Sequence, residues 1–376
     1  SSGSDVFAVG EHKILHYDGT AWSVMNEKRG WLTGIWGTSG SDVFAVGMLS
    51  EFHQTNIISH YDGTTWNYMM RGSADNLADV WGSSATNVFA VGDYENLNYD
   101  IGQIVRYDGT TWNGTVSGRY GDGVSGGSGH HLYGIWGTSA SDVFAVGSYY
   151  DGNHDHAVIL HSDGSSWSRM NSGISSASLR SVWGSSPTDV FAVGQGYDYS
   201  NHILHYDGTV WSPMAAPPGS GDLEDVWGTS ASDVYVVGGG GTILHYDGTA
   251  WMPMESSSTA TLQGVWGSSA ADVFAVGSLY DRYGSAGVIL HFDGSAWSPM
   301  STGWTPGLAA VWGSSASDVF AVGQAGTILH YNGSTWRRMP SGTATGLKGV
   351  WGESTGEVFA VGSGGIVLHY SAAPDR

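Results

Sequence analysis

One histidine position recurs along the chain, inside a segment typified by TILHYDG, and an aspartate commonly stands two residues after it. Imidazole and carboxylate side chains are the usual groups of general acid–base catalysis. A catalytic site needs one asymmetric arrangement, whereas repeated imidazoles are expected to satisfy carboxylates or backbone groups inside each copy. The sequence therefore predicts no catalytic residue and no enzyme. The repeated histidines are His16, His60, His161, His205, His245, His291, His330 and His369, with Arg106 in their place once.

The insertion DGNHDH offers oxygen ligands for a metal ion. Asp151, Asn153 and Asp155 stand at alternating positions, and such oxygens can converge on Ca²⁺ in a loop. The glycine and distal glutamate of an EF-hand are missing, so a solvated polar loop is the alternative. His154 and His156 lack the further ligands that usually define a transition-metal site. Calcium is therefore the one cofactor for which the sequence offers a candidate site.

Aromatic residues outside the repeat positions could stack on a ligand. Sixteen of the 18 tryptophans occupy two repeat positions, where they are expected to fill seams between sheets. Trp31 and Trp304 stand apart, and either they stack on a ligand or they fold back over their own sheet. Eight tyrosines gather in variable insertions, where they suit adaptable recognition or hold the insertions in order. They are Tyr94, Tyr99, Tyr149, Tyr150, Tyr197, Tyr199, Tyr280 and Tyr283.

A repeat of blade size positions these residues. Each unit carries four short segments, typified by GVWG, DVFAVG, TILHYDG and TAW-x-x-M, which we name strands A to D. Strand B is a continuous apolar run too short for a helix, which predicts a strand buried on both faces. Four strands in a unit averaging 44 residues are typical of a β-propeller blade. Nine copies of strand B begin at Asp5, Asp42, Asn87, Asp142, Asp189, Asp233, Asp272, Asp318 and Glu357.

The connections divide into constant and variable ones. The strand A tryptophan precedes strand B by six positions in all eight copies that contain it, and an Asp-Gly pair, or Asn332-Gly333, joins C to D. Asp-Gly predicts a type I′ hairpin turn. The B-to-C and D-to-A connections vary in length. Since alternate connections of an up-and-down sheet lie at opposite ends of its strands, one face of the disc should carry the constant turns and the other the variable loops.

Counting strands predicts the number of blades. Strands B and C occur nine times, and A and D occur eight times. A ring without an exposed sheet edge needs its missing strands from elsewhere. We expect a single propeller domain over residues 1–376 with nine blades, closed by a stretch upstream of residue 1. Eight blades with two spare strands are the alternative.

Two groups of propellers have similar motifs. The turn in HYDGTTW, and in HSDGSSW from His161 to Trp167, resembles a shortened Asp-box of BNR-type, sialidase-like propellers. The stretch WG-x4-DVFAVG followed by ILHYDG-x-x-W is similar to the repeat of bacterial propeller lectins that bind fucose. The lectin resemblance implies sugars held between blades by aromatic stacking. A sialidase would need an arginine cluster, whereas the 13 basic residues of this chain are scattered.

The composition of the chain excludes some classes of binding partner. The 34 acidic and 13 basic residues give a formal net charge of −21, which repels nucleic acid and anionic lipid. The chain has no cysteine, and no apolar run approaches the roughly 20 residues of a membrane span.

The leading hypothesis is an extracellular or cell-surface recognition protein that binds a glycan or another surface molecule through the face with variable loops. A structural module that assembles with itself or other proteins is the second hypothesis. A BNR-type glycosidase is the third.

Overall fold

The computed structural model describes the backbone of residues 6–17, 21–39, 42–49, 55–61, 66–71, 76–84, 86–96, 99–117, 130–151, 153–196, 198, 200–281, 284–353, 357–363 and 366–371. Side chains are described at Ala21 and Ser23 and, from Leu77 onward, over most of these ranges. Strands account for nearly all the regular structure, as the alternation of short apolar segments and glycine-rich turns predicts.

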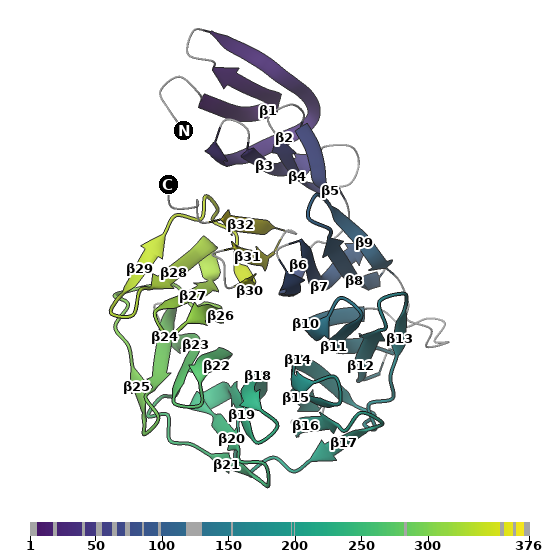
Figure 1. Ribbon diagram of the computed structural model, residues 1–376, viewed down its shortest axis with the longest axis vertical. Coiled ribbons are helices and arrows are strands. Elements are labelled where there is room, and N and C mark those ends of the chain that lie inside the picture. Colours follow the sequence, from purple (N-terminus) through teal and green to yellow (C-terminus); the bar gives the residue numbers. More distant parts are fainter. Residues whose placement is uncertain are drawn as a thin grey trace.

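Seven antiparallel sheets form a closed ring, which we number as blades 1 to 7 (Figure 1). In the order A to D, blade 1 is β6 (Asn76–Ser84), β7 (Asn87–Asn96), β8 (Tyr99–Tyr107) and β9 (Trp112–Ser117), and blade 2 is β10 (His130–Ser139), β11 (Asp142–Tyr150), β12 (Asp155–Ser162) and β13 (Trp167–Arg169). Blade 3 is β14 (Ala177–Ser186), β15 (Asp189–Gly196), β16 (Asn201–Tyr206) and β17 (Trp211–Met214), and blade 4 is β18 (Leu223–Ser230), β19 (Asp233–Gly238), β20 (Ile243–Tyr246) and β21 (Trp251–Pro253). Blade 5 is β22 (Thr261–Ser269), β23 (Asp272–Asp281), β24 (Gly284–Phe292) and β25 (Trp297–Pro299), and blade 6 is β26 (Leu308–Ser315), β27 (Asp318–Gly323), β28 (Thr327–Tyr331) and β29 (Trp336–Met339). Blade 7 has three strands, β30 (Leu347–Glu353), β31 (Glu357–Gly362) and β32 (Val367–Ser371).

The first two repeats form a separate five-stranded sheet beside the ring (Figure 1). In this sheet, strands B and C of the first repeat merge into β1, and strand D of the first repeat merges with strand A of the second into β2. Its strands are β1 (Val6–Tyr17), β2 (Trp22–Ser39), β3 (Asp42–Leu49), β4 (Thr55–Tyr61) and β5 (Trp66–Arg71).

The prediction of nine blades, and the alternative of eight, are therefore wrong. The ring closes where β30 packs against β6. At this junction the Trp351 ring lies 2.7 Å from where a Cβ on Gly82 would stand, as the Trp136 ring does at Gly184. The closing seam thus has the same tryptophan-on-glycine packing as the seam between blades 2 and 3. The number of copies in a sequence does not fix the size of a ring, because that size depends on the angle between neighbouring blades.

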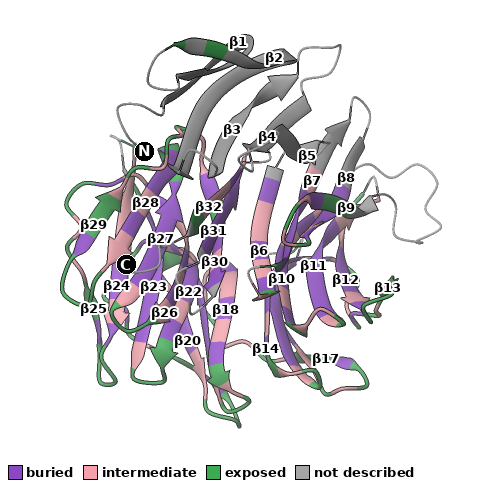
Figure 2. Ribbon diagram, turned by 45° about the horizontal axis from the view of Figure 1, so that its top comes forward, coloured by how far each residue is buried: buried purple, intermediate pink, exposed green. Residues whose placement is uncertain are grey.

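Strand B forms the core of each blade, as its apolar run predicts. In β19 every residue from Val234 to Gly238 is buried, and β27 has the same burial pattern. Figure 2 shows buried residues along the strands and exposed ones at the turns. The strand D tryptophans fill the seams between blades, as expected. Trp211, for example, lies 6.2 Å from Phe144 of the preceding blade, ring centre to ring centre and edge to face.

The C-to-D turn differs from the predicted type I′ turn. Gly208 has a φ of +90°, but no turn aspartate is among the described residues with positive φ. Asp207 instead uses its Oδ1 to accept hydrogen bonds from Thr209 Oγ1 at 2.6 Å and from the amides of Thr209 and Val210 at 2.8 and 2.9 Å. These bonds, led by that of the Thr209 hydroxyl, lower the pKa of Asp207 to about 2. The side chain therefore stabilises a wider turn than a two-residue hairpin.

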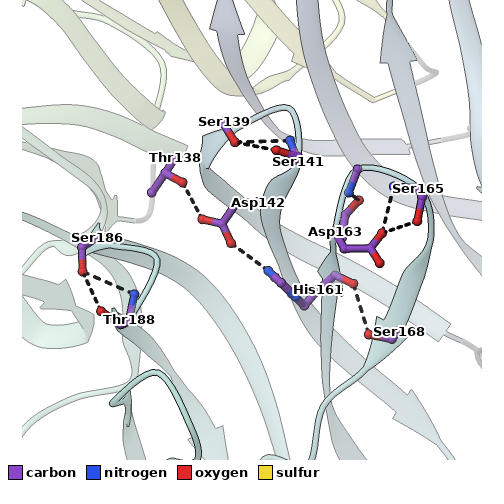
Figure 3. Close-up of polar contacts among 12 residues, drawn as sticks. Thr138, Ser139, Ser141, Asp142, His161, Asp163, Ser165, Ser168, Ser186 and Thr188 are labelled. Carbon is purple, nitrogen blue, oxygen red and sulfur yellow. Dashed lines mark hydrogen bonds and ion pairs between the residues drawn. The ribbon is translucent and has the colours of Figure 1, made fainter.

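The repeated histidines pair with the first residue of strand B, as Figure 3 shows for blade 2. His161 Nε2 lies 2.8 Å from Asp142 Oδ1, and Thr138 Oγ1 donates to Asp142 Oδ2 at 2.5 Å. Asp142 thus lies between His161 and Thr138. In a nucleophilic triad the histidine contacts the hydroxyl directly as its base, which His161 does not do here. The expectation that these imidazoles satisfy carboxylates within each blade is confirmed for blades 2 to 6.

Blade 1 keeps the same link with different residues. Asn87 replaces the aspartate and Arg106 replaces the histidine, and Arg106 Nε donates to Asn87 Oδ1 at 2.7 Å. Asn87 Nδ2 donates to Ser83 Oγ at 2.6 Å. Asn87 thus accepts from Arg106 at the position where an aspartate contacts a histidine in blades 2 to 6.

Candidate functional site

The strand order within each blade places all B-to-C and D-to-A connections at one end of the sheets. The longest B-to-C insertions are not loops, however. In blades 1, 2 and 5 they continue strands B and C as hairpins that extend beyond the shorter blades 4 and 6, whose B-to-C connections are the 3₁₀ turns Gly239–Gly241 and Gln324–Gly326. The extra residues continue the strand ladder because backbone pairing satisfies their amides and carbonyls. The variable face is thus built from rigid hairpins and D-to-A loops.

Blade 5 carries the most exposed aromatic residues in the described part of the chain, one on its extended hairpin and one in the loop that follows strand D. Trp304 is 81 % exposed and Tyr280 is 63 % exposed, and Leu279 beside Tyr280 is also exposed. Tyr280 lies near the tip of the hairpin, paired with Ser285, and Trp304 lies in the connection from β25 to β26. We call Tyr280 and Trp304 the blade 5 aromatic site.

The D-to-A loop packs over one face of this hairpin. Gly287 donates its amide hydrogen to the Thr305 carbonyl at 2.8 Å, and Ala286 bridges to Pro306. A Cβ on Gly287 would lie 2.6 Å from both Thr305 Cγ2 and Pro306 O. Only glycine allows this close approach of loop to hairpin.

The same face of the hairpin carries Tyr280. Gly287 pairs with Ser278, and residues directly opposite in a sheet project on the same side. Ser278 and Tyr280 share that side because side chains alternate along a strand. The loop bearing Trp304 therefore covers the face from which Tyr280 projects. The two exposed residues thus lie on segments that contact each other, which the sequence could not show, since they are 24 positions apart.

The blade 2 tyrosines divide into one internal and one exposed ring. Tyr149 stacks on His156 with ring centres 4.9 Å apart, and the Arg169 guanidinium lies 4.9 Å above the Tyr149 ring. Tyr149 thus holds its own hairpin together, as the alternative interpretation of these insertions expected. Tyr150, one residue later, is 40 % exposed and remains a candidate.

The remaining aromatic candidates lie within strands or outside the described residues. Trp31 lies inside β2, opposite Met48, and not in a loop as we expected, because strand D of one repeat and strand A of the next run together there. Tyr94 and Tyr99 lie in β7 and β8, and not in a loop between them. Tyr197, Tyr199 and Tyr283, with the side chains of Trp31, Tyr94 and Tyr99, lie outside the described residues.

Asp151, one of the candidate calcium ligands, accepts hydrogen bonds within its own turn. Asp151 Oδ1 accepts the amides of Asn153 and His154 at 2.7 and 2.9 Å, and Asp151 Oδ2 lies 2.8 Å from His156 Nε2. These contacts, led by the His154 amide, hold the pKa of Asp151 well below its ordinary value. Asp155 begins strand β12 and pairs with Tyr150. Within the described ranges, no three His, Asp or Glu side chains are grouped as a metal site.

Two carboxylates close to the ring axis were missed by sequence reasoning. Asp79 and Asp225 occupy the same position of strand A in blades 1 and 4. Each carboxylate links its strand to the next one, since Asp79 Oδ2 accepts the Ile135 amide at 2.9 Å and Asp225 Oδ2 accepts the Val265 amide at 2.8 Å. Burial raises the pKa of Asp79 to about 7 and that of Asp225 to about 6. The feature of the sequence that could have identified them is an aspartate within an otherwise largely apolar segment, LADVWG or LEDVWG.

A serine, a histidine and an aspartate meet in blade 3 without forming a nucleophile. Ser200 Oγ lies 3.3 Å from His202 Nε2 but donates its hydrogen to Asp198 Oδ1 at 2.5 Å. Burial lowers the pKa of His202. Because the hydroxyl hydrogen goes to Asp198, His202 is not placed to remove it.

Comparison with known proteins shows the fold. No family model matches the chain, and no curated protein matches it. Among solved structures, it is similar to YCF48 bound to D1 peptide, with a TM-score of 0.59 and 15 % identity over 80 % of this chain and 93 % of that one. YCF48 from Cyanidioschyzon merolae matches with a TM-score of 0.55 and 15 % identity over 82 % and 99 % of the two chains. The WD40 β-propeller domain of Doa1 matches with a TM-score of 0.59 and 14 % identity over 81 % and 95 %.

The resemblance to BNR-type propellers and fucose-binding lectins is not confirmed by these matches. No helix in the described ranges is both long and apolar enough to span a membrane. Together, the ring of four-stranded blades and the similar solved structures show that this chain has a β-propeller fold.

Proposed function

We propose that this protein is a non-catalytic interaction module that binds a polypeptide at the blade 5 aromatic site. The observation that carries the proposal is the pair of exposed rings Tyr280 and Trp304, which lie on a hairpin and on the loop that packs against it. Tyrosine and tryptophan give large contact areas at low cost in side-chain entropy, and they are enriched among the residues that dominate protein interfaces.

Two further observations support a polypeptide ligand. The ring shares its fold with a structure described as YCF48 bound to D1 peptide. The net charge of −21 favours a neutral or basic ligand and repels nucleic acid.

The test is a peptide array probed with the wild-type chain and with the double variant Trp304→Ala/Tyr280→Ala. The matched control is Val210→Ala, since Val210 is exposed on the opposite face in a constant C-to-D turn. We expect discrete bound sequences for the wild type and for the control, and loss of that binding in the double variant. Binding that survives the double variant would show that the ligand lies elsewhere.

A glycan ligand is the second candidate, because exposed indole and phenol rings also stack on sugars. A glycan array probed with the same three proteins separates the two candidates. Sugar binding that needs Trp304, together with no peptide binding, would replace the polypeptide proposal.

We also propose an extracellular or cell-surface location, on the basis of the repeat type and the acidity. Fractionation of the source cells tests this location.

A further inference from the structure

The outer edge of blade 7 differs from that of the other six blades. In blades 1 to 6 a strand D that begins with tryptophan pairs with strand C, so that Tyr331, for example, stands opposite Trp336. No described strand pairs with the outer side of β32. Its outward amides and carbonyls form an edge on which another strand can add.

The side chains at this edge also lack one member of a repeated contact. At six seams, the strand D tryptophan of one blade meets a Phe or Tyr of the preceding blade edge-on, with ring centres 6.1 to 6.5 Å apart. The corresponding ring at the seventh seam is Phe320, which contacts His330 and Tyr370. Its ladder partner Trp312 comes from strand A of its own blade, and no described strand D indole meets it. Tyr370 is 40 % exposed, whereas its counterparts Tyr107 and Phe292 are both 8 % exposed. The edge of blade 7 is therefore shaped for a strand that begins with tryptophan.

Chain order indicates which strand fits. Around the ring, each strand D leads directly into strand A of the next blade, with 15 to 24 positions between their tryptophans. Blade 7 precedes blade 1 in the ring, and the strand A tryptophan of blade 1 is Trp81. Trp66, the first residue of β5, stands 15 positions before Trp81, the same spacing as from Trp336 to Trp351. The segment TTW-x-x-M that contains Trp66 also has the strand D pattern.

We propose that the outer edge of β32 is a docking site for β5, which exchanges between β4 and blade 7. In the structure β5 pairs with β4 and lies against β9 of blade 1 (Figure 1). The connection from β5 to β6 keeps the segment close to the ring, so its effective concentration at β32 exceeds that of any strand from another molecule. In the docked state Trp66 stands opposite Tyr370 and Asn67 opposite His369, which is the register of the filled blades. Phe320 then gains its indole, and every ring blade has four strands.

Paired cysteines test the exchange, because the chain has no cysteine of its own. Asn67→Cys is combined with His369→Cys to trap the docked state, or with His60→Cys to trap the pairing of β5 with β4. His60 and His369 hold the same position of strand C, so the two pairs are matched. A second set, Tyr68→Cys with Leu368→Cys or Ser59→Cys, moves the bond to the next pair, because facing positions differ in Cα separation along an antiparallel ladder.

We expect a disulfide between residues 67 and 369, or between 68 and 368, in most of the monomer on a non-reducing gel, with the bond identified by mass spectrometry. Cross-linking only to His60→Cys or Ser59→Cys overturns the proposal, and so does a 67–369 bond found only between two molecules. If no pair cross-links, hydrogen exchange of the uncrosslinked chain decides. Slow exchange of the outward β32 amides that becomes fast in Trp66→Ala supports docking, and fast exchange in the wild type overturns it.

Discussion

Replacing one seam tryptophan by alanine tests how the blades are held together. Trp211 is 5 % exposed and packs between Phe144 of blade 2, at 6.2 Å, and Tyr206 of its own blade, at 5.3 Å. A buried tryptophan removes about 200 Å² from water. At about 25 cal/mol per Å² this corresponds to about 5 kcal/mol, an upper value because unfolded chains also bury some surface.

We therefore expect Trp211→Ala to lower the free energy of unfolding by about 4 kcal/mol, within the usual range for such replacements in a core. Trp211→Phe should cost less, because it keeps one ring and removes the buried Nε1, which has no hydrogen-bond partner among the described residues. Urea unfolding followed by far-ultraviolet circular dichroism measures both changes.

Trp304→Ala is the matched control, because the same substitution then removes an indole that is 81 % exposed. Its stability change should stay within about 0.5 kcal/mol, as for other surface positions. If Trp211→Ala lost less than about 1 kcal/mol, or if Trp304→Ala lost as much as Trp211→Ala, the assignment of strand D tryptophans to the seams would be wrong.

Three further predictions concern charged groups. Burial raises the pKa of Asp79 from 3.8 to about 7, so its contribution to stability is complete below pH 4 and is lost as the pH rises towards 7. The difference in unfolding free energy between wild type and Asp79→Asn should therefore change over this range, and parallel pH profiles would refute the effect. In blade 1, Asn87→Ala and Arg106→Ala each remove the link between these side chains, so their losses of stability should overlap by about 1 kcal/mol in a double-mutant cycle; additive losses would argue against the link. Because the Asp151 oxygens already accept three hydrogen bonds, replacing EGTA by calcium should shift the melting temperature by less than about 1 °C, and a larger rise that Asp151→Asn abolishes would show a calcium site.

The candidate site was predictable in part. The sequence separated a constant face from a variable one and selected Trp304 and Tyr280, because a tryptophan outside the repeat positions has no seam to fill. It also selected Tyr149, whose ring stacks on His156 and lies under the Arg169 guanidinium, and Trp31, which lies within a strand. Composition cannot distinguish a ring that stacks on a ligand from one that stacks on its own hairpin, since both need the same residue types.

The sequence by itself determined the blade. Alternation of apolar segments with tight turns specifies strands locally, and a strand with two apolar faces must have sheets on both sides, so the four-stranded unit and its tryptophan seams follow from short-range patterns. Only the tertiary structure decided that seven of nine repeats close the ring, that β5 lies outside it, and that Asp79 and Asp225 link strands near its axis. These features depend on the angle between neighbouring blades summed around the whole circle, and that angle is set by contacts between residues far apart in the chain.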